Sequence, residues 1–99
     1  MGPLVPVSTR ENLTVSTTIV TLTVPAGASR AFMSLTDGSG TIRFTFDGTD
    51  PTTTAGHQMQ PGDILDLTSP ERTYVEVLQK LEFLREDATD GTLQVDYFA

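Results

Sequence analysis

The residues that could support catalysis in this sequence are few and widely spaced. The chain contains one histidine, His57, and no cysteine. A thiol nucleophile or a Cys-ligated zinc ion is therefore excluded, and a serine hydrolase would have to use His57 as its base. His57 follows Gly56 in a polar stretch, and no Gly-x-Ser-x-Gly pattern accompanies it. We interpret His57 as a solvated or turn-packed residue, and we expect no catalytic residues and no enzymatic activity.

The acidic candidates for a ligand site are two pairs of aspartates, Asp47 with Asp50 and Asp63 with Asp66. Carboxylates three residues apart in a loop could bind calcium weakly, but the spacing is not that of an EF-hand. Whether Asp47 and Asp50 bind an ion stays open at this point. The sequence otherwise predicts no metal site and no cofactor.

A structural turn explains the first aspartate pair without a metal ion. The turn motif consists of Asp47, Gly48, Thr49, Asp50 and Pro51. In this interpretation Asp47 caps its own turn, Gly48 takes a positive φ angle, and Pro51 holds the following chain extended.

The elements that must position these residues are mostly strands, because apolar residues alternate with polar ones, often Thr, along much of the chain. Turn signals recur at strand-length spacing, as in an antiparallel β-sandwich or barrel. The fold class predicted is therefore all-β, a small antiparallel β-sandwich. The expected strands cover residues 12–16, 18–24, 30–36, 41–46, 58–60, 63–67, 81–86 and 92–98.

Two stretches are ambiguous. The alternation slips phase near Thr17, which indicates either a bulge or a corner between two sheets. Ser69-Pro70-Glu71 resembles a helix start, and apolar residues then follow at helical spacing, so the sequence predicts one short helix around residues 70–79. The alternative is that residues 74–77 form a strand segment within an all-β architecture.

The length of 99 residues allows one hydrophobic core, so we expect a single β-sandwich domain over residues 11–99. Residues 1–10 contain two prolines and little periodicity, which predicts an extended N-terminal arm clear of the core. Such an arm could bind a neighbouring molecule. Its candidate partner-binding residues are Pro3, Leu4, Val5, Pro6 and Val7.

The charge balance excludes some partners. Thirteen acidic residues against six Lys and Arg give a net charge of −7, so most of the surface would repel a phosphate backbone, and we expect no nucleic-acid partner. No apolar run approaches the length of a membrane span, so we expect no membrane partner either. These features are typical of a binding or structural module.

The segment 42–52, I-R-F-T-F-D-G-T-D-P-T, resembles a strand-and-turn motif shared by two groups of proteins. One group is the C-terminal β-sandwich module of chitobiase-like glycoside hydrolases. The other is a set of small tailed-phage virion proteins, in which Gly-His, Gly-Asp and a terminal strand follow in the same order as residues 56–57, 62–67 and 88–97 here. The pattern often has Tyr or a polar residue in place of Phe44 and Phe46, and the Leu-rich stretch 78–84 is more apolar than expected, which could mark a subunit contact.

The phage resemblance implies a jelly-roll-like β-sandwich with a structural role in the virion, made in the host cytoplasm. Within that role we expect a capsid decoration protein, a homo-oligomer with a trimer favoured, whose partner is the major capsid protein or another virion protein. The alternatives are a neck or tail component in low copy number, and a carbohydrate-associated accessory module.

Overall fold

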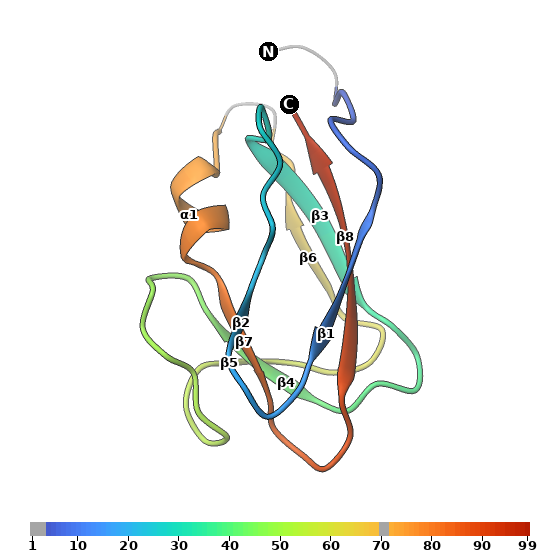
Figure 1. The fold of residues 1–99 in the computed structure, drawn as a ribbon, viewed down its shortest axis with the longest axis vertical. Helices are drawn as coiled ribbons and strands as arrows, with labels where there is room; N and C mark the ends of the chain where they lie inside the picture. Colours follow the sequence, from blue (N-terminus) through green and yellow to red (C-terminus); the bar gives the residue numbers. More distant parts are fainter. Residues whose placement is uncertain (1–3, 70–71) are drawn as a thin grey trace.

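The computed structural model describes residues 4–69 and 72–99, and these form two β-sheets with one short helix (Figure 1). The elements in chain order are β1 (Glu11–Val15), β2 (Val20–Thr21), β3 (Arg30–Leu35), β4 (Ile42–Thr45), β5 (His57–Met59), β6 (Ile64–Leu67), α1 (Val75–Lys80), β7 (Glu82–Arg85) and β8 (Gly91–Phe98). The predicted all-β sandwich is confirmed.

Each sheet has four antiparallel strands. Sheet A has the order β1-β8-β3-β6, and sheet B has the order β2-β7-β4-β5. The pairs β1 with β8, β2 with β7, β3 with β6, and β4 with β5 are nested one inside the next. The chain passes from one sheet to the other after every strand from β1 to β7 except β4.

The hydrophobic core lies between the sheets, and period-2 alternation determines which residues enter it. On β3, Met33 and Leu35 are buried while Phe32 is only half-buried, as the sequence pattern predicts. On β8, Leu93, Val95 and Tyr97 point inward. The fully buried residues with the largest side chains are Tyr97, Phe83, Met33, Leu35, Ile42, Leu78, Leu81, Leu93, Val15, Val95 and Pro51.

The phase slip near Thr17 is a corner between the two sheets, because β1 belongs to sheet A and β2 to sheet B. The predicted strand 18–24 is shortened to Val20–Thr21. Leu22 and Val24 follow that strand and still pack against the core. Their side chains therefore pack in the hydrophobic core although their backbone lies outside the paired strand β2.

The helix is shorter than the sequence predicts and begins later. It covers Val75–Lys80, and its N-cap residue is Tyr74, which makes no side-chain capping bond. The predicted start at Ser69 is wrong because the backbone N–H of Tyr74 donates to the carbonyl oxygen of Ser29 and ties the chain to sheet A. Residues 70 and 71 lie outside the described residues. The predicted strand over 81–86 is confirmed as β7, and the alternative strand at 74–77 is wrong.

Candidate functional site

The segment Val5–Val7 lies along the edge of sheet A, where it continues the side of β8 that pairs with β1. The backbone N–H of Val7 donates to the carbonyl oxygen of Tyr97 at 3.2 Å, and the N–H of Ala99 donates to that of Val5 at 2.9 Å. Pro6 pairs with Phe98 between them. Figure 1 shows the blue N-terminal part of the chain running beside the red β8.

This placement corrects the expectation of an arm clear of the core. Strand β8 extends beyond its pairing with β1, and the N-terminal segment uses the backbone groups that would otherwise stay unpaired at that edge. Val7 packs against the core, whereas the side chains of Leu4 and Val5 are 42% and 51% exposed. Pro3 lies outside the described residues.

The turn motif 47–51 has the local chemistry that the sequence indicates. The carboxylate of Asp47 accepts the backbone N–H of Thr49 at 3.1 Å and the hydroxyl of Thr49 at 2.6 Å. Gly48 has φ +81°, a conformation that favours glycine. The hydrogen bonds from Thr49 hold the pKa of Asp47 below its usual value.

The loop that carries this motif folds back onto the outer face of sheet B. Pro51 is fully buried there. Gly56 is positioned so that a Cβ atom on it would lie 3.0 Å from the carbonyl oxygen of Phe44 and 3.4 Å from the Cβ of Pro51. The guanidinium of Arg43 donates to the carbonyl oxygen of Gly56 at 2.9 Å. The loop 46–56 is therefore a packed part of the structure.

His57 is exposed at the start of β5 and packs against two aromatic rings. Its ring centroid lies 5.5 Å from that of Phe44 and 5.4 Å from that of Phe46. A hollow at this point is lined by Thr45, Phe46, Asp47, Thr49, Gly56 and His57. His57 is thus a turn-packed residue. The hollow brings it close to the turn motif 47–51, and no serine is among the residues that line the hollow.

A polar network joins sheet B to the end of β7. The Nε of Arg43 donates to Glu86 Oε1 at 2.5 Å, and the side-chain amide of Gln58 donates to the same oxygen at 2.7 Å. The bonds from Gln58 and Arg43 hold the pKa of Glu86 below its usual value. Glu86 is therefore ionised at neutral pH, and both described bonds use only one of its two oxygens.

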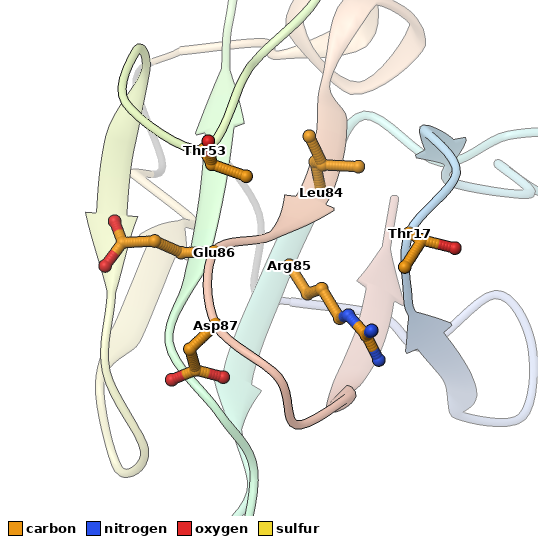
Figure 2. A pocket seen from close by; sticks show the side chains of 6 residues that line it. All are labelled: Thr17, Thr53, Leu84, Arg85, Glu86 and Asp87. Atoms are coloured by element: carbon orange, nitrogen blue, oxygen red, sulfur yellow. The ribbon is translucent and has the colours of Figure 1, made fainter.

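The second hollow, which we call the β7 groove, lies next to this network. Its volume is about 290 Å³. In Figure 2, Thr53 from the loop 46–56 stands on one side, Thr17 from the corner after β1 stands on the other, and Leu84 of β7 lies between them. The groove is lined by Thr17, Thr53, Leu84, Arg85, Glu86 and Asp87.

Carboxylates of like charge meet near the other end of β7. Burial raises the pKa of Glu82, and a hydrogen bond with Asp50 and the charge of Asp47 raise it further. Glu82 pairs with Thr45 across the β4–β7 ladder. Lys80 is the cation that acts on Asp47. Within residues 4–69 and 72–99, no group of three or more His, Cys, Asp and Glu side chains could hold a metal ion.

The Leu-rich stretch 78–84 is mostly core. Leu78 and Leu81 are fully buried, and Leu84 alone of its leucines faces the groove, half-buried. The groove was not predicted, although the alternation Glu82-Phe83-Leu84-Arg85-Glu86 in the sequence indicates an outward leucine between two outward carboxylates.

Comparison with known proteins gives no relative. No family model matches the sequence, and it matches neither a curated protein nor a solved structure. In the part of the chain that the structure describes, no helix is both long enough and apolar enough to span a membrane.

Proposed function

We propose that this protein is a non-enzymatic structural protein of a tailed-phage virion, a decoration protein that binds the outside of the assembled capsid and stabilises it. The observation that carries the proposal is the nested strand order, 1-8-3-6 in one sheet and 2-7-4-5 in the other. We interpret this order as a jelly roll, an architecture that recurs in viral capsid proteins. The motif at 42–52 points to the same group of proteins.

The N-terminal segment is the proposed contact with the capsid. Its backbone already runs along a sheet edge, while Leu4 and Val5 present apolar side chains to solvent. Addition of an extended segment to a sheet edge is a common mode of protein recognition. The net charge of −7 suits the outer surface of a shell better than a surface that faces packaged DNA.

The proposed mechanism is thermodynamic. A protein that binds the assembled shell and not its separated subunits stabilises the shell by mass action. We propose that each homo-oligomer, with a trimer favoured, bridges neighbouring subunits of the major capsid protein. No chemical step is required.

The alternative of a carbohydrate-associated accessory module is less well supported. Lectin domains also use jelly rolls, but carbohydrate modules usually present an exposed aromatic platform. Here the ring of Tyr97 is buried, and its hydroxyl donates to Glu11.

The experiment adds purified protein to capsids that lack it and measures their thermal disruption. Wild-type protein should raise the disruption temperature, and the double variant Leu4→Ser/Val5→Ser should raise it much less. A matched control is Ile19→Ser, since Ile19 is 38% exposed on another part of the surface. Failure of wild-type protein to bind capsids would contradict the decoration role. Equal binding by the double variant would contradict only the role of the N-terminal segment.

A further inference from the structure

We propose that the β7 groove binds an extended segment of a partner protein with a basic, an apolar and a second basic residue at alternate positions. One further residue lies between each of these and the next. This inference concerns a surface distinct from the N-terminal segment and does not rest on the proposed virion function.

The spacing of the partner's residues follows from the spacing on β7. Side chains along a strand alternate between its two faces. Phe83 is fully buried in the core, so Glu82 and Leu84 lie on the outer face. Glu86 continues the same face, because its carboxylate bonds Arg43 and Gln58 there. An extended segment has the same two-residue repeat. Its apolar residue can therefore contact Leu84 while the basic residues two positions before and after it contact Glu82 and Glu86.

The middle of the groove suits one aliphatic side chain. Leu84 provides an apolar floor, and Thr17 and Thr53 stand on either side (Figure 2). The loop that carries Thr53 is held in place by the buried Pro51. The groove is therefore already formed in the isolated chain, so the protein does not have to order a loop when it binds.

Beyond the groove, at the start of β7, Glu82 lies near two aspartates and one lysine, so carboxylates outnumber cations there. Thr45 pairs with Glu82 across the ladder, and its hydroxyl donates to the carbonyl oxygen of Thr49, so the loop 46–56 reaches this point. Asp50 and Asp47 of that loop act electrostatically on Glu82, and Lys80 is the cation that acts on Asp47. The raised pKa of Glu82 reflects this concentration of like charge together with burial. A basic side chain from a partner would relieve the repulsion among these carboxylates.

The end at Glu86 is also negative. Asp87 has a pKa below its usual value because it accepts the backbone N–H groups of Thr89 and Thr41. Arg43 pairs with Glu86 and Arg85 pairs with Asp90, each at 2.5 Å, so the carboxylate of Asp87 is the negative charge left in excess at this end. Charge complementarity therefore selects a basic partner segment over an acidic one.

The test is a titration followed by two-dimensional amide NMR, which detects weak binding and locates it. The probe is a blocked peptide of sequence Gly-Lys-Thr-Leu-Thr-Lys-Gly. We expect saturable shift changes at the amides of Thr17, Thr53 and residues 82–87. Replacing both lysines of the peptide with glutamate should abolish them, and replacing its leucine with serine should weaken binding.

Variants of the protein provide the second arm. Glu82→Gln/Glu86→Gln should weaken peptide binding about fivefold, as expected for two partly exposed ion pairs. The matched control is Asp66→Asn/Asp96→Asn, which makes the same charge change on the outer face of sheet A and should leave binding unchanged. The unchanged amide spectrum of each variant away from the substitutions verifies its fold.

Three outcomes with the peptide would overturn the proposal, and a fourth with lysine amide would do the same. The first three are an absence of shift changes in the groove, equal binding of the glutamate peptide, and equal weakening by the control variant. If lysine amide alone produced the same shifts with the same affinity, the groove would bind isolated cations and the extended-segment proposal would also be wrong.

Discussion

Replacing Gly91 with alanine should destabilise the fold by overfilling the core. Gly91 begins β8 and is buried. A Cβ atom there would lie 2.7 Å from Ile42 Cγ2 and 3.1 Å from Leu35 Cδ1. Ordinary carbon–carbon contacts are about 3.5–4.0 Å, and the two obstructing side chains are fixed in opposite sheets. Overpacking of this kind costs about 1–3 kcal/mol.

Thermal unfolding followed by circular dichroism measures this effect. A loss of about 2 kcal/mol corresponds to a fall in Tm of about 8–16 °C for a domain of this size. The control is Gly38→Asn: nothing lies within 4 Å of a Cβ at Gly38, and asparagine tolerates its φ of +83° better than most residues. A Gly91→Ala protein that melts within a degree or two of wild type would refute the packing argument, as would an equal loss in the control.

The remaining predictions concern single polar groups, each measured by urea unfolding. Glu82→Gln should be more stable than wild type at pH 7 and equal to it below pH 4. The pKa of Glu82 is raised in the folded protein, so the wild-type protein loses stability as the pH rises through that pKa, whereas glutamine does not titrate. Equal stability of the two proteins at both pH values would contradict this. Asp47→Asn should behave oppositely, with a deficit at pH 7 that shrinks as the pH falls below the usual Asp value of 3.8, because the bonds from Thr49 favour the carboxylate; a deficit independent of pH would contradict this reasoning. Tyr97→Phe should cost about 1 kcal/mol through loss of the hydroxyl bond to Glu11, and an unchanged unfolding midpoint would show that this bond contributes nothing.

The strands were predictable because each has one buried face. Alternation on β4 and β8 identifies their inward residues directly, since a shift of one residue would expose them all. The start of α1 was not predictable, because it depends on the bond between Tyr74 and Ser29 across the fold.

The candidate sites were predictable only in part. The turn at Asp47 follows from local chemistry, but local signals do not indicate that Pro51 is buried on the outer face of sheet B. The pairing of Val5–Val7 with β8 and the assembly of the β7 groove both depend on residues distant in the sequence. The spacing of apolar residues and the positions of turn-forming residues carry no information about such long-range contacts.

The central claim is the proposed decoration role. The most direct measurement is the copy number of this chain in purified particles of a tailed phage whose genome carries its gene. Quantitative mass spectrometry would compare it with the major capsid protein. We predict a number of the same order as that of the capsid protein. A handful of copies per particle would indicate a neck or tail component, and complete absence from the particles would contradict a virion role altogether.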